Sequence, residues 1–207
     1  MSFPSDPLVP ARRAGRRPAS SRAAIEEAAG ELFLENTYGG TTIEQITTRA
    51  GVSRASFFNY FRAKSDLLWG DVDVLIADVA SRLSVQRHDV APLDGIRSAI
   101  ISLVADITPD RIPLAITQWE LMGVREDLLA SGLPRFAALA AIVQRHLESR
   151  CHLAPALETR AAAFAVVGAV AAASELWASG GPERGSFSGM LDRAITPVCE
   201  GFARSVR

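Results

Sequence analysis

The sequence has few of the residues that build disulfide frameworks or metal sites. It contains two cysteines and three histidines in 207 residues. Two cysteines make no disulfide framework, which favours a reducing, cytoplasmic setting. His146, Cys151 and His152 lie close together, but an adjacent Cys–His pair lacks the spacing of a tetrahedral metal site. We therefore expect no metal and no cofactor.

Long hydrophobic runs and leader-like segments are also missing. The longest nearly apolar run, from Ala161 to Ala178, is mostly alanine and contains Glu175, so it is a weak candidate for a membrane span. The first twenty residues carry four arginines and no apolar core of a signal peptide. We expect a protein without membrane contact.

Motifs of the common catalytic folds are absent as well. "GSFSG" at 185–189 resembles the G-x-S-x-G elbow, but its central residue is Phe187 and no strand pattern precedes it. No G-x-G-x-x-G or Walker sequence occurs. We therefore predict that the chain is not an enzyme, and a helical enzyme is the less favoured alternative.

The charge that is present is unevenly distributed. Residues 1–70 carry nine basic and seven acidic residues, whereas residues 71–207 carry thirteen basic and sixteen acidic ones. The stretch "RRAGRRPASSR" holds five arginines and no acid. Such a stretch is either a solvated tail or an arm that follows phosphates or enters a minor groove of DNA.

Hydrophobic residues recur with a period of 3.6 almost throughout, and alternating strand patterns are missing. The sequence therefore predicts an all-α fold. Thr42 with Gln45, or equally Thr41 with Glu44, has the spacing of a capping box, and Ser53 is a good N-cap. We expect about nine helices, near residues 21–36, 43–50, 54–61, 64–87, 93–107, 113–122, 125–150 (broken near "SGLP"), 155–178 and 186–205.

Two short helices separated by a turn at Gly51 have the spacing of a helix-turn-helix. The segment "GGTTIEQITTRAGVSRASFFNYFRAKSDLL", residues 39–68, resembles the DNA-binding signature of the TetR family of bacterial repressors. The residues that match the signature are Thr41, Thr42, Ile46, Ala50, Gly51, Val52, Ser53, Tyr60, Phe61, Lys64 and Leu67. The resemblance implies a flexible basic arm (1–20), a helix-turn-helix domain (21–66) and an effector-binding and dimerisation domain (67–207).

The third helix carries four aromatic residues within five positions. At 100° per residue, Phe57 and Phe61 share one face and should be core. Ala55, Phe58 and Asn59 lie on the opposite face, where a major groove would be read. The amide of Asn59 can bond an adenine edge, and Phe58 can contact a thymine methyl group. The expected phosphate or backbone contacts come from Thr42, Ser53, Arg54, Tyr60 and Lys64, with Arg16 and Arg17 in the arm.

The chain departs from the family pattern at two positions. Phe58 stands where the family usually has a tyrosine that bonds a phosphate, so that contact is either lost or replaced by apolar contact. Ala63 stands where a serine or asparagine usually caps the fourth helix. We therefore expect the fourth helix to begin later, with Ser65 as its cap and Asp66 at its positive end.

For the larger lobe, the resemblance implies a homodimer formed by the last two helices and a small-molecule effector. Small residues in the 161–178 run fit either a central buried helix or a helix that a partner approaches closely, and the residues alone favour the buried helix. The resemblance favours the dimer interface, with apolar partners in the last helix: Phe187, Met190, Leu191, Ile195, Val198 and Phe202. The candidate pocket residues are large or polar side chains of the middle helices: Trp119, Glu120, Met122, Arg125, Phe136, Leu139, Val143, His146, Phe164 and Trp177.

The composition of these helices favours a hydrophobic effector. "LLWGDVD", residues 67–73, also resembles the start of the fourth helix in mycofactocin-associated regulators, some of which respond to acyl-CoA. The implied function is a repressor released from operator DNA when the effector displaces a rigid fourth helix. An effector-independent, architectural DNA-binding protein is the alternative.

Overall fold

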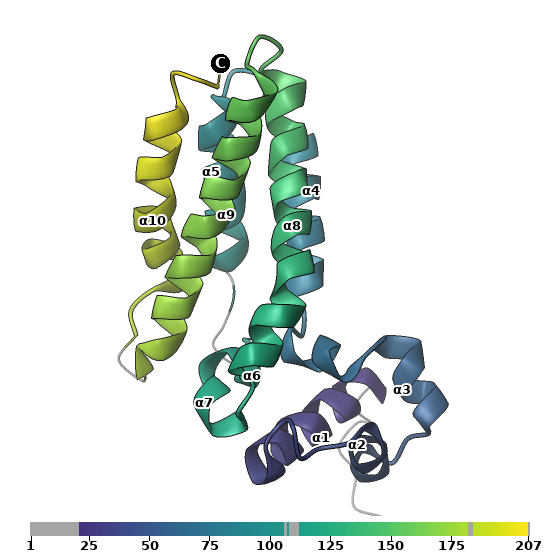
Figure 1. Ribbon diagram of the computed structural model, residues 1–207. Helices are drawn as coiled ribbons and strands as arrows, with labels where there is room; N and C mark the ends of the chain where they lie inside the picture. Colours follow the sequence, from purple (N-terminus) through teal and green to yellow (C-terminus); the bar gives the residue numbers. More distant parts are fainter. Residues whose placement is uncertain (1–20, 106, 108–111, 182–183, 207) are drawn as a thin grey trace, which may run out of the picture.

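The computed structural model describes residues 21–105, 107, 112–181 and 184–206. These residues form ten α-helices and one 3₁₀ helix without a strand, which confirms the all-α prediction with a slightly different count (Figure 1). The predicted arm, with Arg16 and Arg17, lies outside the described residues.

Three helices form a small unit, called here the reading head: α1 (Ser21–Asn36), α2 (Ile43–Ala50) and α3 (Arg54–Tyr60). Thr42 caps α2, and its capping box with Gln45 is present as predicted. Gly51 ends α2 with φ of 67°, a conformation that glycine adopts without strain. The Ser53 hydroxyl accepts a hydrogen bond from the Ser56 N–H at the start of α3. Local capping therefore fixes both ends of the helix-turn-helix.

The predicted long fourth helix is wrong, because the chain breaks at residues 69–71. The 3₁₀ helix η1 (Lys64–Leu68) and helix α4 (Val72–Ser84) flank this break, and Gly70 lies within it at φ of +49°. The predicted cap is wrong as well. Asp66, rather than Ser65, accepts hydrogen bonds from the backbone N–H groups of Arg62 and Ala63. Asp66 thus supplies the N3 half of a capping box, whereas Ala63 offers no side-chain acceptor to the first N–H groups of η1.

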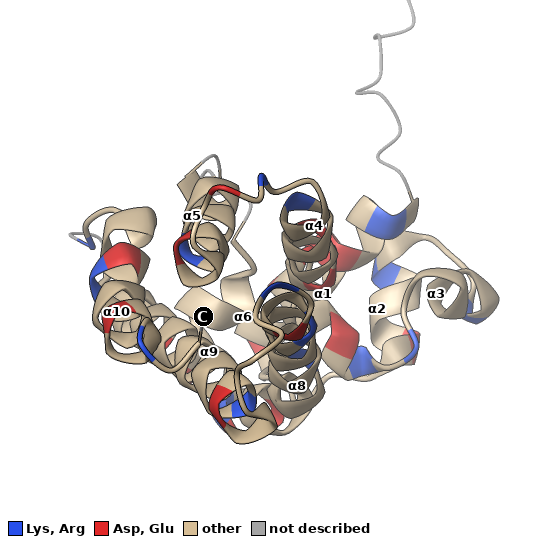
Figure 2. Cartoon of the chain, turned by 90° about the horizontal axis from the view of Figure 1, so that it is seen from above, with Lys and Arg blue, Asp and Glu red and all other residues tan. Residues whose placement is uncertain are grey.

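The larger lobe consists of α4 and six further helices. They are α5 (Pro92–Ala105), α6 (Leu114–Thr117), α7 (Trp119–Met122), α8 (Arg125–Arg150), α9 (Ala156–Ser179) and α10 (Phe187–Phe202). Seen from above, α8, α9 and α10 form one layer and α4 and α5 another (Figure 2). The short helices α6 and α7 lie near the reading head (Figure 1).

Helix α8 continues through Pro134, so the predicted break near "SGLP" is wrong. The preceding turn packs closely on η1, since a Cβ atom on Gly132 would lie 2.9 Å from the Trp69 ring. Tertiary packing thus overrides the helix-breaking tendency of the sequence here.

Two apolar cores hold the two lobes. The core of the reading head contains Ile25, Ile46 and Phe57 with no exposed surface, and it extends to Met122 and Val124 around α7. The second core joins α4, α5, α8, α9 and α10. Met122 also accepts a hydrogen bond at its carbonyl from Tyr38 N–H, 2.8 Å away, so α7 ties the larger lobe to the reading head.

Helix α9 is long and apolar enough to cross a membrane by length and composition, and 39% of its most apolar window is buried in the fold. Core helices of soluble proteins share these features. Helix α9 packs between α8 and α10 (Figure 1). Its apolar side chains that are buried pack against these two helices.

Candidate functional site

The outward face of α3 exposes the side chains that the sequence assigned to base reading. Ala55 and Asn59 are exposed, and Phe58 and Tyr60 keep 45% and 48% of their surface in solvent. Phe57 and Phe61 are buried on the opposite face, as predicted. The Phe58 ring contacts the edge of Phe57, with centroids 5.3 Å apart. A buried aromatic residue therefore supports the exposed one.

Two capping hydroxyls lie at the starts of the helices that flank the turn. Thr42 Oγ1 accepts from Gln45 N at 3.2 Å, and Ser53 Oγ accepts from Ser56 N at 3.0 Å. A hydroxyl that accepts a bond still has its own hydrogen, so Thr42 can also donate one. Ser53 additionally shares a hydrogen bond with the Ser56 hydroxyl at 3.0 Å.

Arg54 is the exposed cation nearest to Phe58. Its guanidinium lies 5.5 Å from the centre of the Phe58 ring and pairs with Glu44 of α2. Both charged side chains are more than half exposed. Such a surface pair holds its partners weakly, so Arg54 can exchange Glu44 for another anion at small cost.

Lys64 binds within the protein. Its ammonium donates hydrogen bonds to the carbonyls of Tyr38 and Thr41 at 2.7 and 2.8 Å, and it lies 3.9 Å from the centre of the Tyr38 ring. Burial lowers the pKa of Lys64, and it raises the pKa of the Tyr38 hydroxyl to about 12 together with the charges of Asp127 and Asp66. Lys64 thus ties η1 to the α1–α2 loop, and one of its three donors is left for a further contact.

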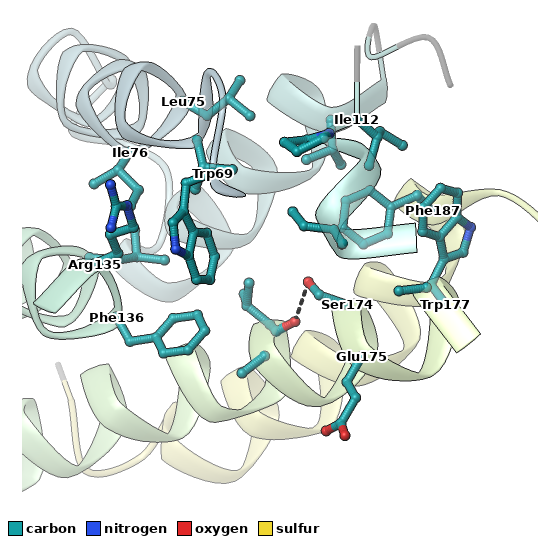
Figure 3. A pocket seen from close by; sticks show the side chains of 18 of the residues that line it. Trp69, Leu75, Ile76, Ile112, Arg135, Phe136, Ser174, Glu175, Trp177 and Phe187 are labelled. Carbon is teal, nitrogen blue, oxygen red and sulfur yellow. Dashed lines mark hydrogen bonds between the residues drawn. The ribbon is translucent and has the colours of Figure 1, made fainter. Parts of the chain in front are cut away.

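A cavity of about 320 Å³ lies in the larger lobe, with Trp69 and Asp71 of the break in its wall. Most of its wall is apolar (Figure 3). Arg125, Arg135, Asp71, Ser174 and Glu175 are its charged or hydroxyl-bearing members. In Figure 3 the Glu175 side chain points away from the cavity, and Ser174 Oγ donates to the Val170 carbonyl of its own helix at 2.7 Å. The interior therefore suits an apolar molecule.

Five of the ten predicted pocket residues line this cavity: Trp119, Arg125, Phe136, Leu139 and Trp177. The other five lie elsewhere. Glu120 is exposed, and Phe164 is 52% exposed on the outer side of α9. Met122 belongs to the core of the reading head, and Val143 is fully buried in the second core.

His146 is 9% exposed, and its Nε2 has no hydrogen-bond partner among the described residues. Burial and the charge of Arg150 lower its pKa. It lies two turns beyond the last α8 residue that reaches the cavity, which is why it is core rather than lining.

The sequence reasoning missed most of the wall contributed by α4 and α5. Examples are Leu75, Ile76, Ile100 and Leu103, with Trp69 from the break and Phe187 from α10. Aliphatic residues at intervals of three and four mark a buried helix face, but they do not show whether that face meets another side chain or an empty space.

One corner of the cavity holds Arg135 beside Trp69 and Phe136 (Figure 3). Arg135 of α8 lies 5.2 Å from the centre of the Trp69 ring and is 9% exposed. Its Nη2 donates to Asp66 of η1 at 3.1 Å and to Asp73 of α4 at 2.8 Å. Burial raises the pKa of Asp66, but the hydrogen bonds from Arg135 and from the Arg62 and Ala63 N–H groups outweigh it, so the pKa is lowered overall.

The outer face of α9 carries exposed apolar side chains along its length. Leu157 and Phe164, seven residues apart on one side of the helix, are 75% and 52% exposed. Gly168 follows on the same side, with nothing within 4 Å of the position of a Cβ atom. On α10, two of the predicted interface residues, Leu191 and Ile195, are buried in the chain's own core. Phe187, Met190, Val198 and Phe202 are partly buried against the same core.

Both lobes match models of known protein families. Residues 25–68 match the bacterial regulatory proteins of the tetR family, and residues 90–203 match the MftR C-terminal domain. The chain is 27% identical over 90 residues to a protein named as the mycofactocin biosynthesis transcriptional regulator MftR of Mycobacterium tuberculosis, covering 44% of this chain and 46% of the relative. It is 29% identical over 101 residues to the transcriptional regulator TtgR of Pseudomonas putida, covering 48% of each. These matches span less than half the length of the curated relatives.

Solved structures support the fold. NalD, the secondary repressor of the MexAB-OprM multidrug efflux pump in Pseudomonas aeruginosa, aligns with a TM-score of 0.61 at 21% identity over 87% of this chain and 96% of its own. AlkX, a repressor from a Dietzia strain implicated in biodegradation of n-alkanes, aligns with a TM-score of 0.51 at 13% identity over 89% and 98%. The MftR-type domain alone accounts for more than half of the residues, and a tetR-type domain precedes it. The chain belongs to the TetR family of bacterial regulatory proteins.

Proposed function

We propose that the protein is a transcriptional regulator that binds operator DNA and is released by a small hydrophobic effector. The observation that carries the proposal is the outward face of α3, where Ala55, Phe58 and Asn59 are exposed together beside the capping hydroxyls. An exposed ring beside an amide on a helix-turn-helix is accounted for by contact with base edges.

Each residue of this face has a chemical role in the proposal. Asn59 can bond the N6 and N7 edge of adenine, and Phe58 can contact a thymine methyl group. Ala55 leaves room for close approach of the groove. Thr42, Ser53, Arg54 and Tyr60 contribute contacts to the sugar–phosphate backbone, and Arg16 and Arg17 would do the same from the arm. For Lys64 we propose a shared role, in which its main contribution is the internal contact with the α1–α2 loop.

A dimer is part of the proposal, because one helix-turn-helix binds too little DNA for useful affinity. Family membership supports an interface formed by α9 and α10. The exposed face of α9 supports it too, since Leu157, Phe164 and Gly168 lie along it. Gly168 would let a partner helix approach closely.

The apolar cavity supports a hydrophobic effector, such as an acyl chain. A ligand chain would be held by burial rather than by hydrogen bonds, at about 25 cal/mol per Å² of apolar surface. We keep the division into an arm (1–20), a helix-turn-helix domain (21–66) and an effector and dimer domain (67–207), and a cytoplasmic location, as parts of this proposal.

The test is selection of double-stranded DNA by the purified full chain, followed by binding assays at several salt concentrations with and without a panel of fatty acids, acyl-CoAs and drugs. We expect one preferred palindromic sequence and its release by at least one apolar compound. Preferred binding that no compound changes would indicate an effector-independent DNA-binding protein. Failure to bind any DNA at low salt would contradict the proposal.

The variant Asn59→Ala tests the base contact. We expect it to relax the preference at one or two base pairs at a cost of about 1–3 kcal/mol of binding free energy, because a base-edge contact is lost. Gln144→Ala removes an amide from α8, far from α3, and serves as the control. An equal loss of affinity for all sequences would show that Asn59 contacts phosphate instead.

A further inference from the structure

The break between η1 and α4 determines how a displacement at the cavity can reach the reading head. A continuous fourth helix would carry a displacement from the cavity to the reading head as a rigid rod. Here the chain at Trp69–Asp71, called the joint, contains Gly70 at φ of +49°, and it separates the two helical segments. A joint with a glycine can bend, so motion of α4 alone need not move η1.

One side chain bridges the joint from outside. Arg135 of α8 donates from a single nitrogen to Asp66 on the η1 side and to Asp73 on the α4 side. Its other terminal nitrogen donates to the Ser131 carbonyl at 2.9 Å, which fixes the guanidinium to its own helix. Trp69 of the joint donates through Nε1 to Ser131 Oγ at 2.9 Å. Helix α8 therefore holds both segments and the joint itself.

The same contacts reach the end of the reading helix. Asp66 accepts from the backbone N–H of Arg62 at 2.9 Å and of Ala63 at 3.3 Å, directly after α3. Within the joint, Gly70 and Asp71 accept hydrogen bonds from Arg22 of α1, through the Gly70 carbonyl and the Asp71 carboxylate, each at 3.3 Å. Phe61 is the C-cap of α3, and Arg62 is the next residue. A shift of Arg135 would therefore move Asp66 and, through it, the backbone directly after α3.

Arg135 also lies in the wall of the cavity, beside Trp69 and Phe136 (Figure 3). The two rings are edge to face with centroids 6.1 Å apart. An occupant of this corner must contact or displace these rings, and the Trp69 ring stacks on the guanidinium. The geometry points to Arg135 as the positioning residue that couples occupancy of the cavity to the orientation of α3, by clamping η1 to α4 across the joint.

This inference rests on the proposed function and is tested apart from it. The first pair of variants is Arg135→Met and Arg150→Met. Both remove an arginine that ties α8 to another segment, but Arg150 donates to the carbonyls of His88 and Val90 at the far end of α8 and is not part of the cavity wall. We expect Arg135→Met to weaken binding to the selected DNA at least about fivefold without any ligand, the low end of coupling between sites. Arg150→Met should leave it unchanged.

Because Arg135 is buried, Asp73→Asn serves as a second variant that removes one arm of the clamp from a half-exposed position. It should weaken binding to the selected DNA in the same direction, while thermal unfolding shows a folded protein. Hydrogen–deuterium exchange should rise in peptides covering residues 62–75 for both Arg135→Met and Asp73→Asn, and not for Arg150→Met. Unchanged exchange there would overturn the clamp, whether or not the protein binds DNA.

Ala171→Trp tests the link to the cavity, since it fills part of the space without a ligand. We expect it to weaken binding to the selected DNA at least about fivefold in the parent chain. In the Asp73→Asn chain its additional effect should fall to about twofold or less, because non-additivity marks residues that act through one another. No effect in the parent chain, or the full effect in both chains, would overturn the coupling.

Discussion

At the scale of single residues, the side chains around α3 differ in what they already bind inside the protein. Ala55, Phe58 and Asn59 are exposed, whereas Lys64 is engaged with two backbone carbonyls. Those carbonyls belong to Tyr38 and Thr41, in the loop that leads into the helix-turn-helix. A lysine in the position of a phosphate contact thus also fixes the reading head.

Lys64→Met should therefore lower the free energy of unfolding by about 1–3 kcal/mol, because two buried carbonyls lose a charged donor. Urea denaturation followed by circular dichroism measures this. Arg62→Met, at a side chain 90% exposed, is the control and should have little effect. Unchanged stability of Lys64→Met, together with a flatter salt dependence of DNA binding, would instead assign Lys64 to phosphate alone.

Asp66 should give the protein a stability that depends on pH. The bonds from Arg135 and from two backbone N–H groups hold its pKa below the unfolded value, against the effect of burial. A carboxyl with a lowered pKa in the folded state stabilises fully above its unfolded pKa, and this contribution is lost as pH falls through the folded value. The difference in unfolding free energy between the parent and Asp66→Asn should be constant near neutral pH and shrink below about pH 4. A difference that does not change down to pH 3 would contradict the assignment.

At the scale of helices, local signals and tertiary contacts decide different things. The capping residues Thr42 and Ser53 set the starts of α2 and α3 without help from elsewhere. Helix α8 shows the opposite, since it runs through Pro134 while its neighbouring turn packs on Trp69. The close approach at Gly132 is the contact that a larger residue would disturb.

Gly132→Ala should lower stability by about 1 kcal/mol or more, although alanine favours a helix by about as much. The new Cβ atom would lie 2.9 Å from Trp69, whose ring is held by Ser131 and Arg135. Gly201→Ala in α10 adds its Cβ atom to open space and should raise stability. Thermal unfolding of both variants gives the comparison, and a stabilised Gly132→Ala protein would show that Trp69 moves aside freely.

At the scale of the whole molecule, the reading head and the cavity share one boundary. The core of the reading head includes Met122 and Val124 of the larger lobe, and the joint at Gly70 lies between that core and the cavity. The outer face of α9 lies along the larger lobe (Figure 1). A dimer formed there would fix the distance between two reading heads. That distance must match the spacing of the two half-sites of an operator.

Phe164→Arg should convert the proposed dimer to a folded monomer, because the interface would bury a charge on the α9 face. Analytical ultracentrifugation measures the mass, and the monomer should bind the selected DNA at least about tenfold more weakly. Leu121→Arg changes a side chain of similar exposure on α7 and should leave the mass unchanged. A Phe164→Arg protein that remains dimeric would place the interface on another face.

Sequence by itself determined the helical class, the three helices of the reading head and the division of the third helix into a buried and an exposed face. These features follow from short-range rules: the 3.6-residue period, the capping hydroxyls and the turn at Gly51. Tertiary structure decided the break at Gly70, the continuity of α8, the internal contacts of Lys64 and the position of the cavity. Each of these depends on residues far apart in the chain, as Arg135 with Asp66 and Asp73 shows, because an ion pair or an empty space exists only once the helices have packed.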